Sequence, residues 1–385
     1  MNIGVVGVGR LGICFALLLA KAGHSVLASD IRANYVAALN RRQITTNEPQ
    51  VADMLAASSG FTATTDTRAV VQQSSVIYVM VATPSLSDGS YDVSAVWRVV
   101  NDIQECDFDL RGKILVVGCT TNPGDCAKIQ EVLRDKGVSV LYNPEFIAQG
   151  SIVNDLQRAD IVLIGGEHQD VMDRYAQLYN DIQTTKPNIH TMSLTAAEIV
   201  KIGTNCFLTT KISYANMLGQ VLIRSGLEAD VDRALTAIGS DSRIGSKYLR
   251  FGFGFGGPCF PRDNRSFGHY AGRLGLKFNI GATVDGFNRE HAEFMRQYFV
   301  KANAENLPFY MDSVTYKKNS DILEESQQLQ LCRDLLEDGY TVYVEPSALL
   351  PSSFVTAMTE QYKNLQFRSW NDLQAQGLKC YKVAI

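Results

Sequence analysis

The sequence NIGVVGVGRLGICFALLLAKAGHSVLASD occupies residues 2–30 and decides the fold. It begins with a short β-type apolar run and passes through a glycine-rich turn. It continues as an apolar, helix-compatible stretch over residues 13–23 and closes with a second β-type run that ends at residue 30. Strand, tight turn, helix and strand in this order are typical of the opening of a parallel α/β sheet. We therefore expect a sheet with helices packed against it.

The turn contains a GxGxxG pattern made by Gly7, Gly9 and Gly12. The first glycine allows the turn, and the second lets backbone N–H groups approach a pyrophosphate at the start of a helix. Asp30 ends the next strand, where an acid suits the ribose hydroxyls of NAD and repels the extra phosphate of NADP. A purely structural turn can show the same glycines, so the prediction of NAD rests on the whole combination.

Further apolar β-type runs follow at regular intervals, separated by polar, helix-compatible stretches. They read VIYVMVA (76–82), KILVVGC (113–119), VSVLYN (138–143) and DIVLIGG (160–166). This alternation predicts a doubly wound sheet.

The pattern changes near residue 193. Residues 193–226 contain no proline and repeat apolar positions at helical spacing, which predicts one long helix. Strand and helix alternation resumes at residue 307, after a second helical stretch that ends near residue 302. We predict an α/β protein with two Rossmann-like doubly wound domains joined by a long-helix central region. The expected division is 1–193, 194–302 and 303–385.

Composition excludes several classes of partner. The net charge of −4 and pI near 5.8 provide no field that would hold a polyanion, so we expect no nucleic-acid binding. There is no cleavable leader pattern and no run of about eighteen apolar residues, so we expect a cytoplasmic protein without a membrane partner. Eight cysteines without a CxxC pair argue against a metal site.

Three polar residues follow predicted strands at the carboxyl edge, where open α/β sheets bind ligands. They are Thr83, Thr120 and Glu145. Each could instead be a turn or capping residue. Because they come from neighbouring strands, we treat them as candidate site residues.

Lys201 and Asn205 lie four residues apart on the long helix and so share one face, among apolar neighbours. If they face a cleft, the ammonium can stabilise an oxyanion and the amide can orient a hydroxyl. The alternative is an exposed polar stripe.

The segment GSDSRIGSKYLRFGFGFGGPCFPRDNRSF (239–267) surrounds Cys259 with glycines and prolines. Its four glycines between residues 252 and 257 let the backbone pass close to a ligand, and the prolines stiffen the position of the cysteine. Nearby cations would favour the thiolate and bind phosphate. They are Arg243, Lys247, Arg262 and Arg265. Asp263 could orient a water or hold a proton. The alternative is a structural cysteine in a loop.

With these motifs in order, the chain resembles the UDP-glucose/GDP-mannose dehydrogenase family. The resemblance runs through GVVGVGRLG, NEP (47–49), VATP, NPEF, AAEIVKIGTN, DSRIG, GFGFGGPCFPRD and, more weakly, YKKNSDILEES (316–326). It implies an N-terminal NAD-binding domain, a central helix that forms a homodimer, and a C-terminal domain that binds a nucleotide-sugar. It also implies that Cys259 carries first a thiohemiacetal and then a thioester while the sugar is oxidised from alcohol to carboxylate. UDP-glucose oxidation to UDP-glucuronate, for polysaccharide biosynthesis, is the favoured reaction.

The resemblance also assigns roles to residues. It makes Lys201 the oxyanion stabiliser, Asn205 its partner, and Asp263 and Thr120 the groups that position a water or proton, while Glu145 assists hydrolysis. Cofactor contacts fall to Gly7, Gly9, Gly12, Asp30, Thr83 and Thr120. Substrate contacts fall to Glu145, Phe146, Lys201, Asn205, Arg243, Tyr248, Gly256 and Lys317, with Arg243 reaching across the dimer.

Three positions depart from the family pattern. Ala148 and Gln149 replace a basic and an acidic residue, and Glu324 stands where relatives usually have an arginine. GDP-mannose or an N-acetylated UDP-sugar stays open as substrate, because related chains with the same core motifs act on different nucleotide-sugars. A 3-hydroxyacid-type dehydrogenase is the nearest rival, and a nucleotide-sugar binder without turnover is the alternative from another class.

Overall fold

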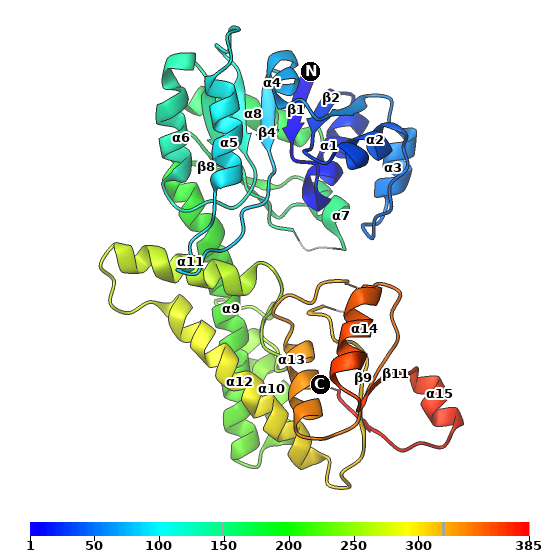
Figure 1. Cartoon of the computed structure of the whole chain (residues 1–385). Helices are drawn as coiled ribbons and strands as arrows, with labels where there is room; N and C mark the ends of the chain where they lie inside the picture. The colour runs from blue at the N-terminus through cyan, green and yellow to red at the C-terminus, as the bar shows by residue number, and fades with distance from the viewer. Residues whose placement is uncertain (148–149, 318–319, 385) are drawn as a thin grey trace. The chain divides into compact units, whose positions relative to one another are not determined.

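The computed structural model describes residues 1–147, 150–317 and 320–384. The chain divides into two compact units, Met1–Ile202 and Gly203–Ile385 (Figure 1). The boundary falls inside one long helix, α9 (Leu194–Arg224). The three-domain division stays a proposal. The departures at Ala148 and Gln149 lie outside the described residues.

The first unit is built on an eight-stranded sheet with the order β3-β2-β1-β4-β5-β6-β7-β8. Its strands are β1 (Asn2–Val6), β2 (Ser25–Ser29), β3 (Phe61–Thr64), β4 (Val76–Val79), β5 (Ile114–Val117), β6 (Ser139–Tyr142), β7 (Ile161–Gly165) and β8 (Asn188–Met192). The chain leaves β1 toward β2 and β3 on one side and returns to β4 on the other. This reversal beside β1 is the topological switch of a doubly wound sheet, as predicted.

Helices cover both faces of this sheet. They are α1 (Arg10–Lys21), α2 (Ala33–Asn40), α3 (Val51–Ala57), α4 (Thr67–Gln73), α5 (Ser94–Gln104), α6 (Asp125–Leu133), α7 (Ile152–Gln157) and α8 (Gln169–Asn180), with a 3₁₀ turn at Arg134–Lys136. One core contains side chains of α1, α2, α3, α7 and α8, and a second contains those of α4, α5, α6 and the first turn of α9. The two-layer covering explains why the strands read as continuous apolar runs.

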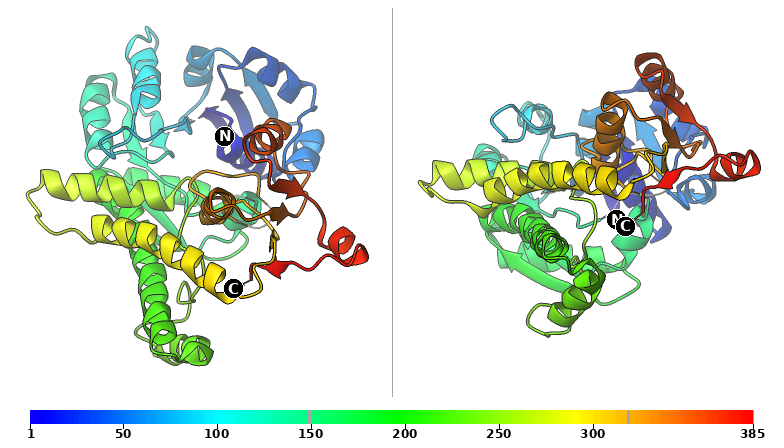
Figure 2. Two further views of the ribbon diagram at one scale, coloured as in Figure 1. Left: turned by 60° about the horizontal axis from the view of Figure 1, so that its bottom comes forward. Right: turned by 90° about the horizontal axis from the view of Figure 1, so that it is seen from below.

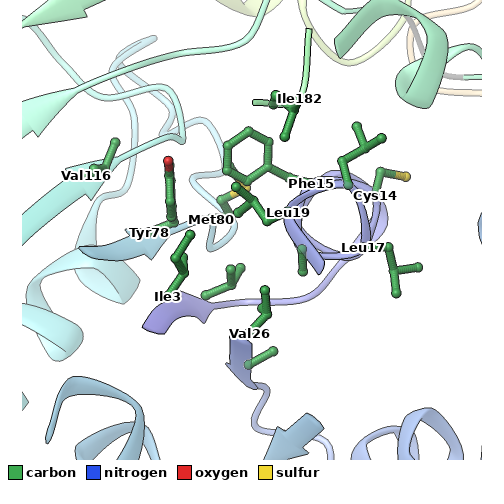
Figure 3. Packing of buried hydrophobic residues seen from close by; sticks show 14 of the residues in the cluster. Ile3, Cys14, Phe15, Leu17, Leu19, Val26, Tyr78, Met80, Val116 and Ile182 are labelled. Atoms are coloured by element: carbon green, nitrogen blue, oxygen red, sulfur yellow. The ribbon is translucent and has the colours of Figure 1, made fainter. Parts of the chain in front are cut away.

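The first helix anchors its core because it is apolar on nearly every side. Phe15 and Leu19 of α1 are buried and belong to the same cluster as Ile3 of β1 and Tyr78 of β4 (Figure 3). The rings of Phe15 and Tyr78 meet edge to face with centroids 4.6 Å apart. This packing fixes the helix start, and hence the glycine turn, against the sheet.

The sheet is mixed rather than wholly parallel. β7 pairs with β6 in the antiparallel sense, through Tyr142 and Gly165, and with β8 in the parallel sense. Among the described residues of the link between β6 and β7, the one helix is the six-residue α7. β7 enters the sheet in the direction opposite to that of β6.

The second unit is mainly helical before its own sheet begins. Its helices are the remainder of α9, α10 (Val231–Gly239), α11 (Phe260–Arg273), α12 (Ile280–Ala302), α13 (Gln327–Glu337), α14 (Ser352–Gln361) and α15 (Trp370–Ala375), with a 3₁₀ turn at Glu228–Asp230. The predicted ends of the long helix and of the stretch that finishes at Ala302 are both confirmed.

A four-stranded parallel sheet follows with the order β11-β10-β9-β12. It lies in the orange to red part of the chain in Figure 2. Its strands are β9 (Phe309–Met311), β10 (Val342–Val344), β11 (Leu365–Phe367) and β12 (Tyr381–Lys382). α13 ends before Gly339, whose φ of +89° needs a glycine, and its buried face joins the core of this sheet. The second Rossmann-like region is thus confirmed, although its strands are short. Within the described ranges, no helix combines the length and apolarity needed to cross a bilayer.

Candidate active site

The glycine turn after β1 contains glycines with different tasks. A Cβ added at Gly12 would lie 2.0 Å from the carbonyl oxygen of Gly7, and one at Gly7, whose φ is +90°, would lie 2.6 Å from that of Met80. A Cβ at Gly9, directly before α1, would meet no atom of the described residues within 4 Å. Gly7 and Gly12 are therefore required by the fold. Gly9 leaves open space at a helix N-terminus, as a bound pyrophosphate requires.

Asp30 stands at the end of β2 with its side chain only 7% exposed. Arg32 donates from Nε and one terminal nitrogen to the two oxygens of Asp30, both at 2.8 Å. The pKa of Asp30 is lowered, because these hydrogen bonds and the charge of Arg32 outweigh its burial. An ionised acid at this point fits the ribose of NAD.

Loops after β4 and β5 place Thr83 and Thr120 at the same edge of the sheet, since the two strands pair in parallel. Thr83 is buried and Thr120 is half-buried. The neighbour of Thr120, Thr121, is fully buried and donates its hydroxyl to Glu198 at 2.7 Å.

Glu198 is a residue whose role sequence reasoning missed. Its buried carboxylate also accepts the backbone N–H groups of Gly124 at 2.6 Å and Cys126 at 2.9 Å, at the start of α6. Burial raises its pKa, and the three donors act in the opposite direction. Glu198 thus ties the β5 loop to α9 one turn before Lys201. Glu198 is the one acidic residue of α9, and this was the signal that could have revealed it.

Glu145, in the loop after β6, lies in a buried environment. Tyr179 of α8 donates its hydroxyl to the carboxylate, at 3.0 Å from one oxygen and 2.9 Å from the other. Burial raises the pKa of Glu145 to about 7, while the hydrogen bond from Tyr179 and the charge of Lys201 oppose that rise. A carboxyl group with this pKa can accept or release a proton near neutral pH.

Lys201 is buried and holds the same loop. Its Nζ donates to the backbone oxygen of Glu145 at 2.8 Å and lies 4.7 Å from the ring centre of Phe146. The structure therefore brings together three predicted residues, Glu145, Phe146 and Lys201. The exposed-stripe interpretation of Lys201 is wrong.

Glu48, from the NEP sequence, holds the far end of this loop. Its buried carboxylate accepts the backbone N–H groups of Gly150 at 2.5 Å and Ile152 at 3.3 Å. The resemblance marked Glu48 as part of a motif, but nothing in the sequence pointed to the loop it holds.

In the second unit, Asn205 and Asp263 form a buried pair. The amide nitrogen of Asn205 donates to a carboxylate oxygen of Asp263 at 2.6 Å, and both residues are buried. Asp263 lies in the first turn of α11, so a residue of α9 and one of α11 are fixed against each other. Asn205 is thus also no part of an exposed stripe.

Cys259 precedes α11 directly and is exposed. The fourteen-residue helix begins at Phe260 with Pro261 in its first turn, so the cysteine lies at the positive end of the helix dipole. That position favours a thiolate. The segment therefore displays Cys259 at the surface instead of burying it.

The glycine loop before Cys259 is packed against its own chain. A Cβ at Gly254 would lie 2.2 Å from Oδ1 of Asn288, and one at Gly256 would lie 2.3 Å from the backbone oxygen of Glu325. These glycines are required by internal packing, whereas the sequence had suggested only room for a ligand.

The predicted cationic surroundings are partly neutralised. Arg265 donates to both oxygens of Glu325 at 2.7 Å, and Arg243 is paired with Asp241 at 2.6 Å. Their charges are therefore shared with carboxylates. Arg243, Tyr248, Lys317 and Glu324 are all exposed. Within the described ranges, no cluster of three or more potential metal ligands occurs.

An open α/β sheet with this glycine turn and an acid after β2 defines a dinucleotide-dependent oxidoreductase. The NAD binding domain of the UDP-glucose/GDP-mannose dehydrogenase family matches residues 1–183, and the central domain of that family matches residues 195–290. The chain belongs to the UDP-glucose/GDP-mannose dehydrogenase family. It is an enzyme that uses NAD, as predicted.

Individual relatives agree with this assignment. A putative UDP-glucose 6-dehydrogenase of Bacillus subtilis is 28% identical over 94% of this chain and 85% of its own length. A solved UDP-glucose dehydrogenase from Pyrobaculum islandicum has a TM-score of 0.82 at 26% identity, covering 99% of this chain and 90% of that one. A solved UDP-D-ManNAc dehydrogenase from Pyrococcus horikoshii shares the fold, with a TM-score of 0.76 at 22% identity over 89% and 83% of the two chains.

Proposed function

We propose that this enzyme oxidises the primary alcohol of a nucleotide-sugar to a carboxylate in two steps, with UDP-glucose as substrate and UDP-glucuronate as product. The observation that carries the proposal is the exposed Cys259 at the start of α11, in a segment whose neighbour Asp263 is held by Asn205. A hydroxyacid dehydrogenase has no use for a displayed thiol. Substrate preference follows the UDP-glucose 6-dehydrogenase named among the relatives.

The thiol is needed only for the second oxidation. NAD, when bound, would supply the hydride acceptor for each oxidation, with a second NAD molecule replacing the first after it has been reduced. Cys259 adds to the aldehyde carbon to give a thiohemiacetal, whose oxidation leaves a thioester. Water then attacks the thioester carbonyl, the carbon–sulfur bond breaks, and the thiolate of Cys259 is regenerated with release of the acid.

The other polar residues serve these steps. Lys201 stabilises the oxyanion that develops, while Asn205 and Asp263 orient the reacting hydroxyl and a water. Glu145 removes a proton from the attacking water, and Thr120 positions that water. For the nucleotide-sugar we propose contacts from Phe146, Arg243, Tyr248, Gly256 and Lys317.

We assign cofactor binding to residues whose geometry and charge fit NAD. Gly9 leaves open space before α1, and Asp30 presents an ionised carboxylate after β2. Gly7 and Gly12 shape the turn, and Thr83 and Thr120 line the carboxyl edge of the sheet. Together these six residues would hold the two phosphates and the ribose of NAD.

We further propose a homodimer formed through α9. Four large residues on this helix are exposed at spacings of seven, three and four, which place them on one face. They are Phe207 (66% exposed), Tyr214 (45%), Met217 (46%) and Val221 (54%). An apolar stripe of this length is typical of a subunit interface.

The test counts NADH per sugar. Purified protein is mixed with limiting UDP-glucose, GDP-mannose or N-acetylated UDP-sugars, and NADH is measured against sugar consumed. Two NADH per UDP-glucose support the proposal. One NADH per molecule would indicate a simple alcohol dehydrogenase, and none with any sugar would indicate a binder without turnover.

A further inference from the structure

The carboxylate of Glu145 has a donor that lies behind it in the core of the first unit. Tyr179 belongs to the last turn of α8 and is 1% exposed, and its hydroxyl reaches both oxygens of Glu145 within 3.0 Å. A donor shared by both oxygens fixes the plane of a carboxylate as well as its position. Tyr179 therefore restricts how Glu145 can turn.

The surroundings of Tyr179 are otherwise aromatic. Its ring centre lies 6.1 Å from that of Phe15 and 6.3 Å from that of Tyr175. Phe15, Tyr78, Tyr175 and Tyr179 thus form an aromatic wall, of which Phe15 and Tyr78 are visible in Figure 3. A phenylalanine would satisfy the packing equally well, so the hydroxyl is the part of Tyr179 that the fold does not require. Its function is to be sought in the carboxylate it contacts.

Ionisable groups from three elements face Glu145. They are Tyr78 of β4, Tyr175 and Tyr179 of α8, and Lys201 of α9. Burial raises the pKa of each of these tyrosines, so they stay protonated around neutral pH. Tyr179 is the tyrosine whose hydrogen bond lowers the pKa of Glu145. It therefore favours the ionised carboxylate without itself titrating.

We propose that Tyr179 is a positioning residue for the hydrolytic step: its hydroxyl holds the carboxylate of Glu145 in one orientation and in its ionised form, ready to take a proton from water. This inference rests on the proposed function, in which Glu145 assists hydrolysis of a thioester. Tyr179 touches neither substrate nor cofactor in this account. It acts through Glu145.

The prediction for Tyr179→Phe follows from the lost donor. Without it the ionised form of Glu145 is less stable, so its pKa rises and the acid limb of the hydrolysis rate moves to higher pH. A hydrogen bond to a charged group corresponds to about one pH unit or more. At pH values well above the new limb, most of the wild-type rate should return, because the base is then ionised again.

The experiment follows decay of the covalent adduct on Cys259 by mass spectrometry at several pH values. The matched control is Tyr175→Phe, which removes a buried hydroxyl that donates to Asn143 in the same aromatic wall. We expect the acid limb to move in Tyr179→Phe and to stay in Tyr175→Phe, while the affinity for NAD, measured by calorimetry, is unchanged in both.

The variant Glu145→Gln distinguishes the positioning role of Tyr179 from the role of Glu145 itself. Its acid limb should vanish, and Tyr179→Phe added to it should change the pH profile no further. An unmoved limb in Tyr179→Phe, or an equal shift in Tyr175→Phe, would overturn the positioning role alone. Retention of the wild-type limb in Glu145→Gln would overturn the role of Glu145, and lack of any adduct in the wild-type protein would overturn the covalent mechanism itself.

Discussion

Arg32 and Asp30 form a two-pronged ion pair at the end of β2, with both nitrogen–oxygen distances at 2.8 Å. The carboxylate is nearly buried while the side chain of Arg32 is 56% exposed and also lies 4.2 Å from the ring centre of Tyr35. The pair places the guanidinium of Arg32 beside the acid that we propose selects for NAD.

The first prediction concerns cofactor choice. Wild-type protein should bind NAD at least tenfold more tightly than NADP, or about 1.4 kcal/mol. Asp30→Ala should reduce that preference, because it removes the repulsion of a 2′-phosphate and releases Arg32 to bind it. Adding Arg32→Leu should cancel the gain for NADP. Calorimetric titration of each variant with both cofactors measures this, and equal affinities in the wild-type protein would contradict the role of Asp30.

The second prediction separates two glycines of one motif. Gly9→Ala should leave the thermal unfolding midpoint nearly unchanged, because its Cβ meets no atom of the described residues within 4 Å. It should nevertheless weaken NAD binding about tenfold, by filling the space for the pyrophosphate. Gly12→Ala is the matched contrast, since its Cβ would lie 2.0 Å from a backbone oxygen and should destabilise the fold. A Gly9→Ala variant with normal NAD affinity would show that the pyrophosphate lies elsewhere.

Most of the fold could be predicted from the sequence because its signals are local. Apolar runs located six of the eight strands of the first sheet, while β3 and β8 were not predicted, and helical spacing located the ends of α9. The reversed direction of β7 was not predicted, since the sense in which a strand pairs is set by contacts between residues that are separated in the sequence, such as Tyr142 and Gly165. The same limit applied to the pairing of Arg265 with Glu325, residues sixty positions apart.

Residues of the site divide in a similar way. Residues with unusual chemistry in a recognisable motif, such as Cys259 and Lys201, could be proposed as site residues from the sequence. Glu198 and Tyr179 could not, because a glutamate or tyrosine in a helix acquires a role only from the partner that folding brings to it. Thr121 and Glu145, their respective partners, are 77 and 34 residues away.

The third prediction is that Cys259→Ala loses steady acid formation by more than about a thousandfold, as expected when a nucleophile is removed. A single turnover should still give NADH from the first oxidation, because the thiol has nothing to attack before an aldehyde exists. Cys380→Ala, which alters a half-buried cysteine of the C-terminal region, is the control and should retain activity. Stopped-flow absorbance of NADH measures both phases. Near-normal turnover of Cys259→Ala would favour the simple hydroxyacid mechanism.

The fourth prediction concerns the nucleotide-sugar. Glu324 is exposed where relatives usually have an arginine, and a carboxylate cannot bind a pyrophosphate. Lys317 is exposed in the same segment, whereas its neighbour Lys318 lies outside the described residues. Lys317→Ala should raise the KM for the nucleotide-sugar at least tenfold and leave that for NAD unchanged. If Glu324→Ala causes that loss and Lys317→Ala does not, the carboxylate contacts the sugar directly.

The last prediction links Glu145 to stability. Its pKa is raised from 4.5 to about 7 by burial, so the folded protein binds a proton more tightly than the unfolded chain. The stability that this proton contributes is fully present below about pH 4.5 and is lost as the pH rises through about 7. Since one pKa unit corresponds to about 1.4 kcal/mol, the loss is on the order of 3 kcal/mol.

Glu145→Gln keeps the shape of the side chain but does not ionise. We therefore expect its stability relative to the wild-type protein to increase with pH, with little difference near pH 4.5 and a higher unfolding midpoint for the variant near pH 8. Differential scanning calorimetry at the two pH values measures this difference, in which the titration of all other groups cancels to first order. Tyr175→Phe serves as the control, because its effect on the midpoint should not depend on pH in this range. A constant difference for Glu145→Gln would mean that Glu145 is ionised throughout. In that case the pKa of Glu145 would not be raised, and the carboxylate would lack the pKa near the working pH at which a general base is most effective.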